Sequence, residues 1–253
     1  MDERLNSKIY FSKRINFDFV IIVHKYLKDK RDINMILIGF DFSINKPAAT
    51  VLMDGKLKFF IWPIKLSGPE EKIYARTEVH VLNRHLSEVS KKSNLNTSQM
   101  ALEHTKRSID LAETIVSDLK EYIKNHEDQE IYVASEGFSF ASKGNSNLDL
   151  ATYKGVLLSY IYKTISKNIY TYAPITIKKI AGKSKKEEFE DKNPMIKAFS
   201  EEPFEDVLKT MIKNGETIAK VNHIKCIDDI ADSYFCCKTL YKKEKLKGFP
   251  LWD

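Results

Sequence analysis

The sequence predicts a mixed α/β fold in which three antiparallel strands are followed by parallel strands, with helices on the flanks. Three β-forming segments occur in close succession, and Asp54-Gly55, a dipeptide typical of tight hairpins, separates the second from the third. A long amphipathic helix then leads into another apolar strand, as in the crossover that joins two parallel strands. We therefore expect a five-stranded sheet flanked by helices.

The element order expected from hydrophobic periodicity is βββαβαβα. The first strand, 35–40 (MILIGF), is the strongest short apolar run in the chain and is typical of a buried central strand. Further strands are expected at 48–53, 56–64, 131–135 and 168–173, the last of them ended by Pro174. Helices are expected at about 74–89, 98–126, 148–165, 203–214 and 228–243, with a basic and then mixed-charge segment at 176–200.

The longest predicted helix carries one apolar stripe at alternating spacings of three and four residues. Asn96 or Thr97 is expected to cap its start. The residues of the stripe are Leu102, Thr105, Ile109, Ala112, Val116, Leu119 and Ile123.

Composition excludes several classes of protein. The 253 residues are 43% hydrophobic and 30% charged, as in ordinary globular proteins, and no run of apolar residues is long enough to span a membrane. Residues 1–33 have mixed charge unlike a signal peptide, so we expect an intracellular, non-secreted protein with an N-terminal extension before a domain at 34–253. The net charge of +6 is compatible with a polyanionic partner.

The cysteine and histidine pattern argues against a zinc site. The three cysteines form no Cys-x-x-Cys pair, and the six histidines are scattered. We expect reduced thiols, with Cys236 and Cys237 adjacent on a helix.

Acidic residues stand at three informative places. Asp41 ends the first strand, and Glu136 ends the strand expected to lie beside it, ahead of a loop of small residues. In the last helix, Asp229 and Asp232 are three residues apart and share a face. Asp228 has an equivalent spacing to Asp232, so it is either a further member of the cluster or the N-cap of the helix.

Carboxylates that converge in one cleft repel each other unless cations neutralise them. Such hard oxygen ligands suit Mg²⁺, with Mn²⁺ as a substitute, and two ions about 4 Å apart can activate a water and stabilise a leaving oxygen. A phosphodiesterase mechanism without a protein nucleophile is the chemistry that this cluster favours.

Four motifs together resemble the RuvC family of Holliday-junction resolvases within the ribonuclease H-like superfamily. They are IGFDFS, SEGFSFASKGNSNLDLATYKG, YTYAPITIKKIAGKSKKEE and DDIADSYF. The resemblance covers residues 35–243 and implies a ribonuclease H-like fold. It also implies that two Mg²⁺ ions bind to Asp41, Glu136, Asp229 and Asp232.

The basic segment that follows the fifth strand in this family matches ITIKKIAGKSKK. The resemblance puts Lys183, Lys185 or Lys186 near the scissile phosphate, and Lys183 and Lys186 are the candidate catalytic lysines. A P-loop is excluded for Gly182-Lys183-Ser184, because Ile177 stands where a P-loop requires glycine.

Aromatic and basic residues around the acids are candidates for binding nucleic acid. Phe138 and Phe140 are expected to stack on an unpaired base, although their alternation also fits a core position for one of them. The candidate phosphate contacts, for which a solvated charged loop is the alternative, are Lys143, Lys178, Lys179, Lys183, Lys185 and Lys186.

The resemblance implies a structure-selective DNA endonuclease that resolves Holliday junctions in DNA recombination and repair. Cutting a four-way junction symmetrically requires two active sites related by a two-fold axis, so we expect a homodimer on branched or distorted DNA. Two alternatives stay open: a ribonuclease H-like nuclease for RNA–DNA hybrids or flaps, and an inactive nucleic-acid-binding protein of the same fold.

Overall fold

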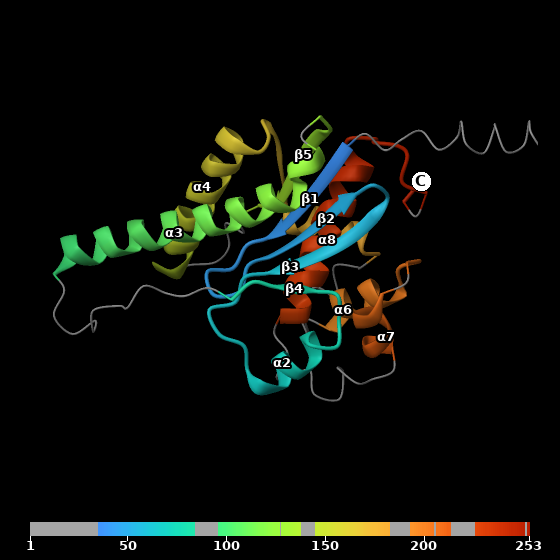
Figure 1. Cartoon of the computed structure of the whole chain (residues 1–253), viewed down its shortest axis with the longest axis horizontal. Coiled ribbons are helices and arrows are strands. Elements are labelled where there is room, and N and C mark those ends of the chain that lie inside the picture. The colour runs from blue at the N-terminus through green and yellow to red at the C-terminus, as the bar shows by residue number, and fades with distance from the viewer. Residues whose placement is uncertain are drawn as a thin grey trace, which may run out of the picture.

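The computed structural model contains a six-stranded mixed sheet with helices on both faces (Figure 1). It describes residues 35–83, 96–126, 128–137, 145–182, 193–204, 206–213, 226–250 and 252–253. The expected extension at 1–33 lies outside these residues.

The strands are β1 (Met35–Asp41), β2 (Ala48–Met53), β3 (Lys56–Ile61), β4 (His80–Val81), β5 (Glu130–Glu136) and β6 (Asn168–Tyr172). The helices are α2 (Gly68–Tyr74), α3 (Thr97–Ile123), α4 (Asn145–Thr164), α5 (Pro174–Ile180), α6 (Asn193–Glu201), α7 (Val207–Lys213) and α8 (Cys226–Lys243), with a short 3₁₀ turn, η2 (Lys124–His126), after α3.

The strand pairing confirms the predicted fold class. The sheet order is β4-β3-β2-β1-β5-β6, with β1, β2 and β3 antiparallel and β1, β5 and β6 parallel. This is the ribonuclease H-like arrangement of a hairpin-linked meander followed by crossover strands. The one addition is β4, a two-residue strand that pairs with the edge of β3 through Phe60 and His80 and was not predicted.

Two hydrophobic cores cover the two faces of the sheet. On one face, Ile36, Ile38 and Phe40 of β1 pack with the apolar residues of α3 and α4. On the other face, Leu37 packs with α8 and the helices beside it. This division follows from strand geometry, because successive side chains of a strand point to opposite faces. In Figure 1, α8 passes behind the strands and α3 lies beside α4.

Helix α3 confirms the predicted helix but corrects the predicted stripe. Asn96 is the N-cap, since its side chain accepts a hydrogen bond from the Gln99 backbone N–H at 3.0 Å. Leu102 is 55% exposed, and Thr105 is exposed as well, because this end of the helix projects past the sheet (Figure 1). The buried stripe begins later and consists of Leu111, Ala112, Ile115, Val116, Leu119 and Ile123.

The prediction of a helix at 74–89 is wrong for residues 75–83, which the structure describes as non-helical. The helical turn instead precedes this range as α2, because Glu70 accepts a hydrogen bond from the Ser67 backbone N–H at 2.7 Å and Pro69 occupies the first turn. Residues 84–89 lie outside the described part of the chain.

Two helices occur in the segment that the sequence indicated only as basic and mixed in charge. Pro174 ends the strand region as predicted, but it also starts α5, where its fixed φ and missing N–H suit the first helical turn. Helix α6 follows at Asn193–Glu201. The helix predicted at 203–214 is shorter than expected and starts at Val207, where Asp206 accepts a hydrogen bond from the Leu208 N–H at 2.8 Å.

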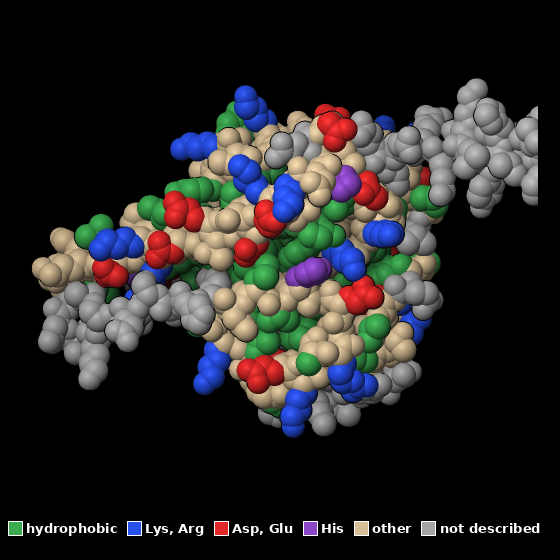
Figure 2. Space-filling view, in the orientation of Figure 1, with side chains coloured by type: hydrophobic (Ala, Val, Ile, Leu, Met, Phe, Trp, Pro, Cys, Tyr) green, Lys and Arg blue, Asp and Glu red, His purple; other side chains and the backbone are tan. Residues whose placement is uncertain are grey.

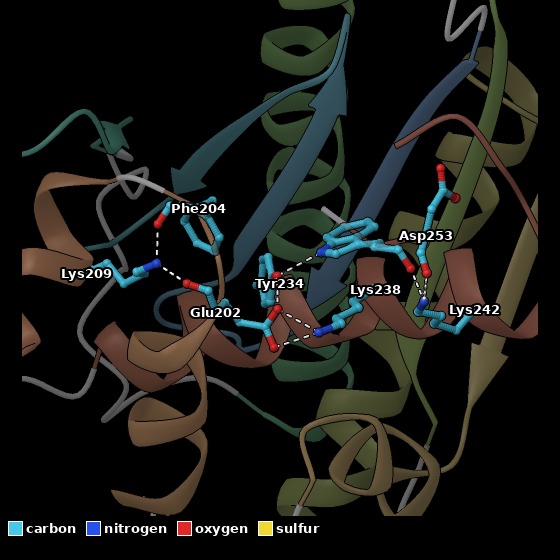
Figure 3. A network of polar contacts seen from close by, with 8 residues as sticks. Glu202, Phe204, Lys209, Tyr234, Lys238, Lys242 and Asp253 are labelled. Atoms are coloured by element: carbon cyan, nitrogen blue, oxygen red, sulfur yellow. Dashed lines mark hydrogen bonds and ion pairs between the residues drawn. The ribbon is translucent and has the colours of Figure 1, made fainter. Parts of the chain in front are cut away.

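A polar network fixes α8 against the C-terminal segment (Figure 3). The carboxylate of Glu202, which is 11% exposed, accepts hydrogen bonds from Lys238 Nζ at 2.6 and 2.7 Å and from Tyr234 Oη at 2.6 Å. Trp252 Nε1 donates to the same tyrosine oxygen at 2.8 Å. Lys209 donates to the Glu202 backbone oxygen, so α7 joins the same network. Charged and polar groups this well buried are stable only when they are paired.

Helix α8 approaches β1 closely at Gly39. A Cβ atom at this position would lie 2.3 Å from the Ser233 carbonyl oxygen and 2.4 Å from the Cys237 backbone nitrogen. The hydroxyls of Thr50 and Ser233, both fully buried, are hydrogen-bonded at 2.8 Å beside this contact. The absence of a side chain at Gly39 therefore allows the backbones of helix and strand to touch.

Among the helices in the described ranges, none has both the length and the apolar character needed to cross a membrane. Cys236 and Cys237 are buried free thiols, as predicted. The side chain of Cys226 is outside the described part.

We expect the substitution Gly39→Ala to lower the free energy of unfolding by about 3 kcal/mol or more, because the new methyl group would meet backbone atoms that cannot rotate away. Urea unfolding followed by circular dichroism measures this change. The matched control is Gly155→Ala in α4, where a Cβ meets no atom within 4 Å and should stabilise the helix by about 0.5–1 kcal/mol. Equal effects at the two glycines would contradict the close packing of α8 on β1.

Candidate active site

The pairing of β1 with β5 brings Asp41 and Glu136 to the same edge and face of the sheet. Gly39 pairs with Ala134 in the parallel register, and both acids lie two residues further along their strands. Leu37 and Ala134 belong to the core beneath α8, so the alternation of side chains directs Asp41 and Glu136 to that same face. Both carboxyl groups are half-buried.

Helix α8 lies across this face and adds acids from its first turns. After burial, the charge of Asp229 is the largest cause that raises the pKa of Asp41, so the two carboxyl groups lie close together. Asp228 is 2% exposed and also lies close enough to repel Asp41. Because α8 already includes Cys226 and Ile227, Asp228 is inside the helix and is not its N-cap.

Asp232 and Cys236 lie one helical turn apart in α8, and the charge of Asp232 acts on the Cys236 thiol. The fully buried Cys236 thiol lies within electrostatic range of Asp232, Asp41 and Glu136. Burial and these carboxylates raise the pKa of Cys236 well above its ordinary value, so the residue is a neutral thiol at neutral pH. The sequence had indicated Cys236 only as a core thiol.

The electrostatics of Asp41 are those of a crowded carboxylate. Its pKa is raised well above the usual value, first by burial and then by the charges of Asp229, Glu136 and Asp228. The structure therefore gathers Asp41, Glu136, Asp228 and Asp229 into one set of mutually repelling groups.

A lysine that sequence reasoning missed lies against this set. Lys154 in α4 is only 4% exposed, and its ammonium group interacts with Glu136, Asp41 and Cys236. Burial raises the pKa of Glu136, while Lys154 opposes that rise. One signal was available in the sequence: Lys154 occupies the i−3 position to the buried Leu157, where an apolar residue is expected.

The carboxylate oxygens of the predicted ligands are of the chemical type that binds a hard divalent cation. Carboxylate oxygens are the ligands that Mg²⁺ prefers, and two of the predicted ligands, Glu136 and Asp229, act electrostatically on a third, Asp41, at one end of the sheet. The fourth, Asp232, lies three residues after Asp229 in α8. As the side chains lie, however, no three His, Cys, Asp or Glu residues in the described ranges form a group arranged to hold a metal ion.

Of the predicted nucleic-acid contacts, two are described. Lys178 and Lys179 lie in the last turn of α5, where Lys178 is half-buried and interacts with Glu136, and Lys179 is exposed. The others, Phe138, Phe140, Lys143, Lys183, Lys185 and Lys186, lie outside the described residues. On the face seen in Figure 2, basic and acidic side chains are intermixed, so this face carries no continuous basic patch among the coloured residues.

Comparisons with known proteins give only distant likenesses. No protein-family model matches the chain, and no curated protein does either. The chain is similar to the structure of Thermus thermophilus RuvC, with 13% identity and a TM-score of 0.40 over 83% of this chain and 97% of that one. The same RuvC in complex with a Holliday junction substrate matches with 12% identity and a TM-score of 0.39, covering 83% and 96% of the two chains.

A third similar structure is the Fowlpox virus resolvase in complex with its substrate Holliday junction DNA. It shares 17% identity with this chain and has a TM-score of 0.35, covering 84% of this chain and all of the other, 100%.

Proposed function

We propose that the chain is a metal-dependent endonuclease of the RuvC type that acts on branched DNA. One observation carries the proposal: Asp41 of β1, Glu136 of β5 and the acids of α8, which are far apart in the sequence, converge at one end of the sheet. A purely structural role would not favour such a set, because half-buried carboxylates that repel each other cost stability.

Some residues of this chain would act as metal ligands, and others would hold those ligands in position. Asp41, Glu136, Asp229 and Asp232 would hold two Mg²⁺ ions, which supply an activated water and charge stabilisation for a phosphodiester displacement. The parallel pairing of β1 and β5 holds the first two carboxyl groups in register, and the packing of α8 on Gly39 positions the other two. A lysine from 183–186 would stabilise the negative charge that develops on the phosphate.

The substrate follows from the motif resemblance and from charge. A net charge of +6 and the run of lysines from Lys178 to Lys186 favour a polyanion, and phosphate contacts supply most of the affinity of such proteins for DNA. A four-way junction has two equivalent scissile positions, so a protein that resolves it would act as a homodimer. Flaps and RNA–DNA hybrids are the competing substrates for the same set of acids.

The Asp41→Asn variant should lose Mg²⁺-dependent cleavage of a labelled four-way junction by about 100-fold or more, because it removes a carboxylate ligand of the proposed metal site. It should not lose stability in the absence of metal, since the neutral amide relieves the repulsion around Asp41. Gel-based cleavage rates and thermal unfolding measure the two effects. Asp110→Asn, an exposed change on α3, is the matched control and should cleave normally. Wild-type cleavage by Asp41→Asn would support the inactive DNA-binding alternative.

A substrate panel separates the candidate nucleases. With Mg²⁺, the protein should cut a four-way junction at least about tenfold faster than a flap or an RNA–DNA hybrid, because two sites related by symmetry can engage the junction together. Light scattering of the complex with DNA should give two protomers for each junction. A monomer on DNA, or preferred cleavage of the hybrid, would contradict junction resolution and leave the ribonuclease H-like alternative.

A further inference from the structure

Two hydroxyl groups in series join β2 to α8 in the interior of the protein. Thr50 Oγ1 and Ser233 Oγ lie 2.8 Å apart, and both residues are fully buried. The Ser233 hydroxyl donates its one proton to the Ile230 carbonyl oxygen at 2.8 Å, so Thr50 is the donor of the first bond. The strand is therefore linked, through the side chain of one serine, to the backbone of the helix.

These hydroxyls lie at the place where α8 comes close to the sheet. Thr50 of β2 pairs directly with Gly39 of β1. The missing side chain of Gly39 leaves room for the Ser233 carbonyl oxygen, while Thr50 binds the hydroxyl of the same serine. Ser233 therefore meets two neighbouring strands at once, one through its main chain and the other through its side chain.

The distances from this contact to the acids match on the strand and on the helix. Asp41 lies two residues beyond Gly39 in β1, which is about 6.6 Å at the usual rise of a strand. Asp229 lies four residues before Ser233 in α8, which is about 6 Å at the rise of an α-helix and on nearly the same face. Fixing Ser233 beside Gly39 therefore also fixes how far Asp229 lies from Asp41.

Apolar contacts alone would hold α8 in this register only weakly. The hydrophobic effect depends on the area that is buried and has no direction, so a small slide or rotation of a helix on an apolar surface costs little. A hydrogen bond weakens steeply as its length and angle change, and a buried hydroxyl that loses its partner is unfavourable. The bond between Thr50 and Ser233 therefore favours one placement of α8 on the sheet.

We propose that Thr50 is a positioning residue, which acts through Ser233 to place the acids of α8 beside Asp41 for the binding of divalent cations. Ser233 directly follows Asp232 and lies one turn after Asp229, so a displacement of the serine moves both predicted ligands. The inference rests on the proposed function, because it concerns the same metal site, but it does not depend on the identity of the nucleic acid.

Calorimetric titration of the DNA-free protein with Mg²⁺ tests the role of Thr50. Thr50→Val keeps the shape of the side chain and removes the hydroxyl, so it should bind Mg²⁺ about tenfold more weakly, because the acids of α8 are no longer held in one place. Thr50→Ser keeps the hydroxyl and should bind Mg²⁺ like the wild type. Wild-type affinity in Thr50→Val, or an equally large loss in Thr50→Ser, would overturn the proposal.

Thr239→Val in α8 is the matched control. Thr239 is also fully buried, but its hydroxyl has no hydrogen-bond partner in the part of the chain that the structure describes. The same chemical change should therefore leave Mg²⁺ binding unaltered at this position. A loss equal to that of Thr50→Val would mean that any change in the core beneath the helix disturbs the acids, which would overturn a specific role for Thr50.

A double variant tests whether Thr50 acts through Ser233. Ser233→Ala should weaken Mg²⁺ binding as Thr50→Val does, and the two changes together should bring little further loss. Losses that add in the double variant would overturn the proposal. If Thr50→Val does not fold, the double variant should fold, because neither hydroxyl is left without its partner, and it should bind Mg²⁺ as weakly as Ser233→Ala. A double variant that also fails to fold would show that the pair serves folding as a whole, which would count against the positioning role.

Cleavage of the four-way junction separates this role from the proposed function. Thr50→Val should lower kcat about tenfold and leave KM for the DNA unchanged, because Thr50 lies inside the protein and acts on the ligands. A wild-type protein that neither binds Mg²⁺ nor cleaves would refute the proposed function, and the positioning role with it. A wild-type protein that does both, with Thr50→Val equal to it, would overturn the positioning role alone.

Discussion

The contact between α8 and β1 at Gly39 is the constraint on which the site depends. A helix normally packs on a sheet through side chains, but here the Ser233 carbonyl oxygen and the Cys237 backbone nitrogen lie within 2.3 and 2.4 Å of the position that a Cβ atom of residue 39 would take. The buried hydrogen bond between Thr50 and Ser233 holds the same crossing. Since α8 carries Asp228 and Asp229, this close approach brings both acids close enough to act on Asp41. The core beneath the helix and the position of the carboxyl groups therefore depend on the same few atoms.

Well-packed parts of the structure hold together the carboxyl groups around Asp41, which repel one another. Burial and, after it, the carboxyl groups beside Asp41 raise its pKa, which means that they disfavour its ionised form and cost stability at neutral pH. The hydrophobic contacts along α8 and the network around Glu202 hold the helix in place against this repulsion. Proteins commonly accept a local loss of stability where charged groups must converge for function.

Local sequence patterns were sufficient for β1, β2, β3, β5 and β6 and for the first two acids, but not for β4. The apolar run before Asp41, the hairpin at Asp54-Gly55 and the helix ahead of β5 predicted the sheet, and the parallel register then aligned Asp41 with Glu136. The pattern was less informative where hydrogen bonds at helix ends decide the outcome. The bond from Ser67 to Glu70 starts a helix earlier than periodicity suggested, and Pro174 starts α5 where the sequence showed only the end of a strand.

The sequence by itself determined which residues could act as ligands, because strand parity and helical spacing are properties of neighbouring positions. Only the tertiary structure decided that Cys236 and Lys154 lie within electrostatic range of Asp41 and Glu136, since these residues come from distant segments of the chain. It also decided that Asp228 lies inside α8, buried near Asp41, where spacing alone had left a helix cap as an equal alternative. Electrostatic interaction depends on distance and burial, and neither quantity is encoded in local spacing.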